Sequence, residues 1–120
     1  MGFWRNQVIQ PALDSEIDAA VREQMALLEL DPSNARAYFA LGTLAHFRGR
    51  TETAIGCFLK AIELAPQDPA PHVSLGRIYA IEGHDDLAWK HAREAERLGD
   101  RSLLEQLERY PHATAEGGKR

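Results

Sequence analysis

The sequence predicts an all-α fold built from stacked pairs of antiparallel helices. Two observations predict it: a pattern that recurs after 34 residues, and apolar residues that recur at helical spacing inside each copy of that pattern. A third observation is that no window alternates apolar and polar residues as a half-buried strand does. We therefore expect about two and a half helical repeats followed by a capping helix.

Residues 35–68 and 69–102 are two copies of one pattern, and they align without a gap. The aligned positions with identical residues are Leu41 and Leu75, Gly42 and Gly76, Gly49 and Gly83, Ala54 and Ala88, Ala61 and Ala95, and Leu64 and Leu98. A helical hairpin needs small or apolar residues at such positions, because its two helices pack closely there. A fixed period of this length is typical of stacked units rather than of a single conventional core.

Within the first copy, the apolar residues predict two helices. One buried stripe follows the spacing i, i+3, i+4, i+7 and consists of Tyr38, Leu41, Gly42 and Ala45. Gly49 then ends the first helix, and Thr51 is the expected N-cap of the second. The second stripe, which ends before Pro66, consists of Ala54, Ile55, Phe58, Ala61 and Ile62.

The second copy has comparable punctuation. Asp68 is the expected N-cap of its first helix, with Pro69 at the first helical position. Gly83 ends that helix, and His84 or Asp85 begins the next one, which Gly99 ends. The second copy is therefore also predicted to be a helical hairpin.

The two copies resemble the tetratricopeptide repeat, whose pattern is W-x2-L-G-x2-Y, then A-x3-F, a further alanine and a closing proline. The first copy matches it with Tyr38, Leu41, Gly42, Ala45, Ala54, Phe58, Ala61 and Pro66. The second copy matches it with His72, Leu75, Gly76, Tyr79, Ala88, Ala92 and Ala95, and has Asp100 where proline is expected. The resemblance covers about residues 14–100 and implies a right-handed α-solenoid. The residues expected to pack the repeats together are Tyr38, Leu41, Gly42, Ala54, Phe58, Ala61, Leu75, Gly76, Tyr79, Ala88 and Ala95.

Both ends of the repeat region depart from the pattern. Pro11 would break a continuous first helix, so we expect residues 1–12 to form an arm or a short helix and residues 13–34 to be a degenerate half repeat. The amphipathic segment 101–110 is the expected capping helix, since a solenoid must cover its last apolar face. Its apolar residues are Leu103, Leu104 and Leu107. Residues 111–120 are predicted to be disordered.

Composition limits the classes of partner. The chain has 14 Lys and Arg against 18 Asp and Glu, a net charge of -4, so it has no long-range attraction for nucleic acid. No stretch approaches the roughly 18 apolar residues that span a membrane. Cys57 is the only cysteine, and residues 1–10 lack the apolar run of a signal peptide. We therefore expect a cytoplasmic protein without nucleic-acid or membrane partners.

No arrangement of residues predicts catalysis, a metal site or a cofactor. The five histidines include no i, i+4 pair of the kind that holds a metal on one helix face. His84 and His91 lie in a loop and a helix interior, which rarely converge. Cys57 has no motif that supplies a base or an oxyanion donor, and no glycine-rich phosphate loop is present. The expected function is therefore not enzymatic.

The first helix of each hairpin has a second face, which packing within the hairpin leaves open. We name this predicted surface the groove face, and its residues are Arg36, Phe39, Thr43, His46 and Phe47 in the first copy and Val73, Arg77 and Ile81 in the second. In the resembled family such faces line a concave groove that holds a partner peptide. The arginines favour a protein or peptide with apolar anchors and an acidic group or C-terminal carboxylate. The lysine and asparagine that would lead a chaperone-tail clamp are absent, so we do not expect that ligand.

Two alternatives to a foreign peptide stay open at this point. The N-terminal arm could cover the groove face with its own apolar residues, which are Phe3, Trp4, Val8 and Ile9. A second copy of the chain could also cover it, since two and a half repeats fall below the roughly three that this architecture prefers. The possible partners are therefore a peptide segment, the chain's own arm, or a homo-oligomer.

Overall fold

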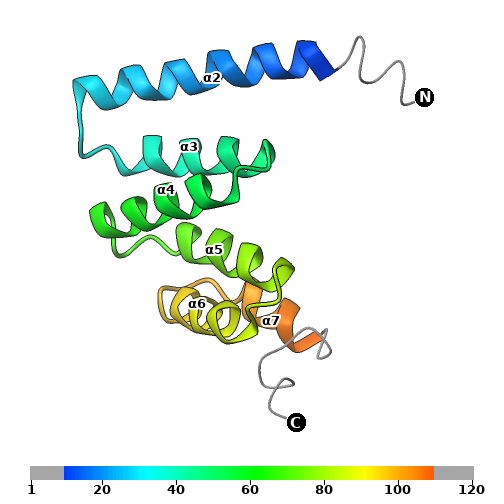
Figure 1. The fold of residues 1–120 in the computed structure, drawn as a ribbon. Coiled ribbons are helices and arrows are strands. Elements are labelled where there is room, and N and C mark those ends of the chain that lie inside the picture. The colour runs from blue at the N-terminus through cyan, green and yellow to red at the C-terminus, as the bar shows by residue number, and fades with distance from the viewer. Residues whose placement is uncertain (1–9, 110–120) are drawn as a thin grey trace.

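The computed structural model describes residues 10–109 and contains helices joined by short turns (Figure 1). The helices are α2 (Gln10–Leu30), α3 (Ala35–Phe47), α4 (Thr51–Leu64), α5 (Ala70–Ile81), α6 (Asp85–Arg97) and α7 (Ser102–Arg109). No strand occurs between residues 10 and 109, so the prediction of an all-α fold is confirmed. Most of the predicted arm and the predicted tail 111–120 lie outside the described residues.

The helices stack in chain order. α3 packs against α4 and α5 packs against α6, so each copy of the 34-residue pattern forms one antiparallel hairpin. Contacts between α4 and α5 join the two hairpins, while α2 packs on α3 at one end of the stack and α7 packs on α6 and α5 at the other (Figure 1). This nearest-neighbour packing is the arrangement that a helical repeat requires. The right-handed course of the stack stays a prediction.

α2 is longer than the sequence indicated. We expected a helix from about residue 13, but α2 already begins at Gln10 and includes Pro11. Proline is tolerated there because the first N–H groups of a helix have no intrahelical partner in any case. α2 therefore extends as one helix of 21 residues beside α3.

Two of the predicted N-caps are wrong by one residue. α4 begins at Thr51 itself, and the capping position belongs to Arg50, whose side chain makes no capping hydrogen bond. α5 begins at Ala70, so that Pro69 stands at the N-cap rather than at the first helical position. Asp68 still serves the start of α5, because its Oδ1 accepts a hydrogen bond from the Ala70 N–H at 3.0 Å.

One cap that the sequence analysis did not name is Asn34, at the start of α3. Its Oδ1 accepts a hydrogen bond of 3.1 Å from the Ala37 N–H, as a side chain at the N-cap position commonly does. The turns after α3 and α5 pass through Gly49 and Gly83, with φ of 80° and 81°. Side chains strain this left-handed conformation, so glycine at these two positions sets where each first helix stops.

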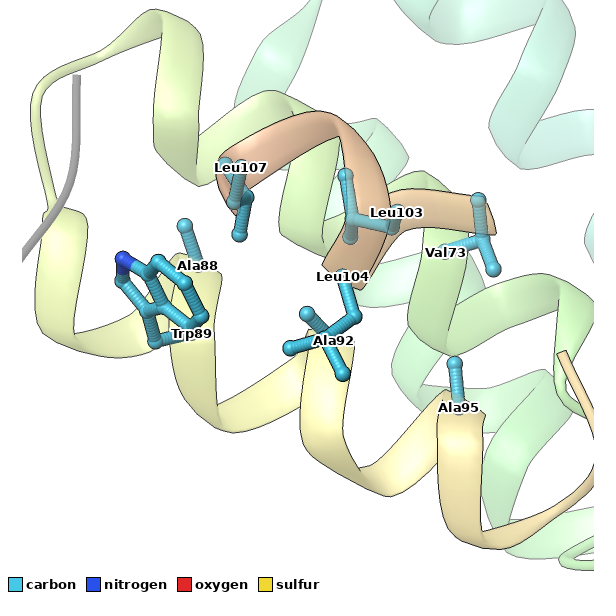
Figure 2. Packing of buried hydrophobic residues seen from close by; sticks show 8 residues of the cluster. All are labelled: Val73, Ala88, Trp89, Ala92, Ala95, Leu103, Leu104 and Leu107. Atoms are coloured by element: carbon cyan, nitrogen blue, oxygen red, sulfur yellow. The ribbon is translucent and has the colours of Figure 1, made fainter. Parts of the chain in front are cut away.

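Two clusters of buried side chains form the core. The first joins the two hairpins and consists of Ala45, Ala54, Phe58, Leu75 and Ile78. The second joins the last hairpin to α7 and consists of Val73, Ala88, Trp89, Ala92, Ala95, Leu103, Leu104 and Leu107 (Figure 2). Among the residues expected to pack the repeats together, Tyr38, Leu41 and Tyr79 are half-buried. The others are buried, namely Gly42, Ala54, Phe58, Ala61, Leu75, Gly76, Ala88 and Ala95.

The paired glycines occupy matching places in the two hairpins but meet different neighbours. A Cβ on Gly42 would lie 2.7 Å from the ring of Phe58 in α4. In the second copy Ala92 stands where Phe58 stands in the first, and the space beside Gly76 is filled by Leu103 of α7. A Cβ on Gly76 would overlap Leu103 Cδ2. α7 therefore supplies, from outside the repeat, the large apolar side chain that the second copy lacks.

Candidate functional site

The groove face on α3 is largely open to solvent. Its residues repeat at three- and four-residue intervals, which places them on one side of the helix. Phe47 is 71% exposed, and Arg36, Thr43 and His46 are also exposed. Phe39 is half-buried, because its ring packs against Phe58 with the two ring centroids 5.4 Å apart. Phe39 therefore belongs partly to the core, whereas Phe47 is free to contact another molecule.

Arg36 and Phe39 line a hollow of about 610 Å³. Its walls come from α2, α3 and the start of α5, and its other lining residues are Gln24, Leu27, Asn34, Ala37, Ala40, Asp68 and Ala70. The sequence analysis did not include Leu27, which stands where the two complete copies have the buried alanines Ala61 and Ala95. At this position Leu27 is 40% exposed, so it offers an apolar contact at the edge of the hollow. The alignment at 34-residue intervals could have identified this position, because it places the large residue Leu27 where the other copies have alanine.

Phe47 lines a second hollow, of about 500 Å³, at the other end of α3. Most of its remaining lining is charged and consists of Asp14, Ile17, Asp18, Arg48 and Arg50. Arg48 forms a salt bridge with Asp18 and also donates a hydrogen bond to the Asp14 backbone oxygen at 3.1 Å. These contacts hold α2 against the end of α3, so the structure places Phe47 beside a paired, polar surface rather than in the first hollow.

The second copy contributes less open surface than we expected. The prediction that Val73 is an open groove residue is wrong: Val73 is only 7% exposed, because it packs in the cluster that α7 closes. Arg77 is exposed and lies near Asp100, in the turn before α7. Hydrogen bonds from Ser102 lower the pKa of Asp100, and the Arg77 guanidinium lowers that pKa further. Ile81, at 76% exposed, is the most accessible of the three residues.

The thiol of Cys57 and the metal-ligating types of side chain between residues 10 and 109 bear on catalysis and metal binding. Burial raises the pKa of the half-buried Cys57 thiol, whereas a nucleophilic cysteine needs a lowered one. Between residues 10 and 109, no three His, Cys, Asp or Glu side chains lie close enough to hold a metal ion. None of the helices in this range is long and apolar enough to cross a membrane.

One pair of histidines escaped the sequence analysis. His72 of α5 and His91 of α6 are buried, at 8% exposed each, and their Nδ1 atoms are 2.9 Å apart. The sequence analysis considered His84 with His91 instead, because those two histidines are close together along the chain. Only the pairing of α5 with α6 brings residues 72 and 91 together.

The comparisons with known proteins agree with this architecture. Residues 25–56, which run from α2 through α3 into α4, match the family model of the tetratricopeptide repeat. This match confirms the resemblance over residues 25–56. Repeats of this family generally serve as protein–protein interaction modules. No curated protein matches the chain.

Proposed function

We propose that the chain is a non-catalytic interaction module that binds a segment of a partner protein on the groove face of α3 and α5. The observation that carries this proposal is the pair Phe47 and Ile81, which are 71% and 76% exposed. They are 34 residues apart and stand at the same position of the two copies. Equivalent positions of stacked repeats line one side of the stack, so these two side chains form repeated apolar contacts for one ligand.

The charged side chains near this face indicate which chemical groups the ligand carries. Arg36 borders the hollow that Phe39 and Leu27 make partly apolar, and Arg77 lies on α5 of the next hairpin. A guanidinium binds a carboxylate with two parallel hydrogen bonds. The expected ligand is therefore an extended or helical segment with apolar anchors and an acidic side chain or a C-terminal carboxylate.

A peptide library tests this proposal. Random dodecamer peptides displayed on phage are selected on the full chain, and the affinity of the synthetic peptide is measured by fluorescence anisotropy. We expect the double variant Phe47→Ser with Ile81→Ser to weaken binding at least tenfold, because the loss of two exposed apolar anchors removes about 1–2 kcal/mol or more. Both side chains are largely exposed, so the variant should keep its helicity.

Leu59→Ser is the matched control. Leu59 is 48% exposed and lies on α4, the second helix of its hairpin and outside the groove face. The control should bind the peptide as the unmodified chain does. If the double variant binds as tightly as this control, the groove face is not the ligand site.

A second candidate function is self-association, in which the N-terminal arm or a second copy fills the groove. Apolar side chains on α2 favour it, because Met25 and Leu30 are 56% and 85% exposed on a helix whose main packing partner among residues 10–109 is α3. Light scattering distinguishes the two functions: self-association predicts a mass that rises with concentration and falls in the Leu30→Ser variant. A constant monomer mass would exclude association between copies of the chain.

A further inference from the structure

The histidine pair joins the two helices of the last hairpin. At 2.9 Å, the two Nδ1 atoms are within hydrogen-bond distance, so one ring donates an N–H and the other accepts it. The acceptor must be unprotonated. The ring of Tyr79, on α5, stacks on His91 with centroids 5.7 Å apart and an interplanar angle of 18°. The ring of His84, in the turn before α6, forms a T-shaped contact with the ring of Tyr79.

The pair lies directly beside the place where α7 packs on α5. A Cβ on Gly76 would be 3.5 Å from His91 Cβ and would overlap Leu103 of α7, so these three residues meet at one place. The charged groups that act on the pair come from α6: Lys90 and Arg97 oppose a positive charge on it, and Glu94 favours one. From α7, the neighbour at this place is the apolar side chain of Leu103.

We propose that His72 and His91 form an acid-sensitive latch, which holds α5, α6 and α7 together while both rings are neutral and loosens them when the rings take up protons. Two protonated rings would place two N–H donors against each other, so the hydrogen bond between them would be lost. Two positive charges would also be buried side by side without a partner for both. The α3–α4 hairpin has no matching pair, because residues 38 and 57 are Tyr38 and Cys57.

The direction of the effect follows because His72 and His91 bind protons less readily in the folded protein than in the unfolded chain. Burial is the largest cause that lowers the pKa of His91, to about 4, followed by the charge of His72. Burial also lowers the pKa of His72. In the unfolded hairpin both rings titrate near their ordinary pKa of 6.5. The stabilisation is therefore complete above pH 6.5 and is lost progressively as the pH falls toward 4.

Hydrogen exchange of the full chain tests the latch. Amide protection factors are measured by NMR at pH 7 and pH 5, with correction for the intrinsic exchange rate. The change for His91 alone predicts an about 20-fold loss of protection in α5, α6 and α7 between pH 7 and pH 5, with a clearly smaller loss in α3 and α4. An equal change in all of these helices, or no change in α5–α7, would overturn the proposal.

Two variants and a direct titration complete the test. The double variant His72→Leu with His91→Leu replaces both partners by apolar groups, so its protection should change less than threefold over the same pH range. His46→Gln, on the exposed face of α3, should keep the full pH effect. Because the double variant can fail to fold, the pKa of His91 is also read from the imidazole signals of the unmodified chain. A value near 6.5 would overturn the proposal, and one near 4 would support it.

Discussion

Individual glycines show how closely the helices of each hairpin approach. A Cβ on Gly42 would lie 2.7 Å from the ring of Phe58, which is 1% exposed and packed in the core. Gly56 also lies inside a helix, α4, but a Cβ there would meet no atom within 4 Å. At Gly42 a side chain would not fit, whereas at Gly56 glycine affects only the conformational freedom of the helix backbone. The two positions therefore allow these two effects to be measured separately.

We predict opposite effects of alanine at these two glycines. Gly42→Ala should destabilise the fold by about 1–3 kcal/mol, because the new methyl group overpacks the core against Phe58. Gly56→Ala should stabilise it by about 0.5–1 kcal/mol, since alanine restricts the unfolded chain and meets no obstacle. Urea unfolding followed by circular dichroism measures both. A stabilising Gly42→Ala would contradict the close approach of α3 and α4.

Among whole elements, α7 lies outside the repeat pattern and completes one of the two core clusters. Three of its leucines complete the second core cluster, and Leu103 is 2% exposed beside Gly76 (Figure 2). Leu103→Ala should cost about 2–5 kcal/mol in the free energy of unfolding, as a buried leucine truncation does. Glu108→Ala, on the exposed side of the same helix, should change it by less than about 0.5 kcal/mol.

A double-mutant cycle gives this prediction a sharper form. Gly76→Ala should be costly in the unmodified chain, because its methyl group would overlap Leu103. In the Leu103→Ala background the same substitution should cost less, since the obstacle has been removed. Additive free energies of unfolding in the four proteins of the cycle would show that α7 does not pack on Gly76.

The helices themselves could be predicted from the sequence because their causes are local. Stripes at helical spacing and glycines at the turns indicated α3 to α6, and three spaced leucines indicated α7. The errors concern the residues at which helices begin and the contacts between helices that are distant in the sequence. Pro11 is compatible with a first turn as well as with a break, and Val73 is covered in a cluster that α7 completes by packing on α5 and α6.

In the whole molecule, the 34-residue period explains both the stability and the open surface. Each hairpin buries its stripe against its neighbours, and the same period brings Phe47 and Ile81 to equivalent exposed positions. The sequence could predict this face from the resemblance and the helical spacing. It could not predict the hollow beside Leu27 or the histidine pair, because both arise where separate helices meet.

The most direct test of the interaction site is NMR mapping of the selected peptide on the full chain labelled with ¹⁵N. We predict that chemical-shift changes gather on the groove face, at Arg36, Phe39, Phe47, Arg77 and Ile81, with small changes at Leu59 on α4 and Leu87 on α6. The reverse pattern, with the largest changes on the exposed sides of α4 and α6, would contradict the account.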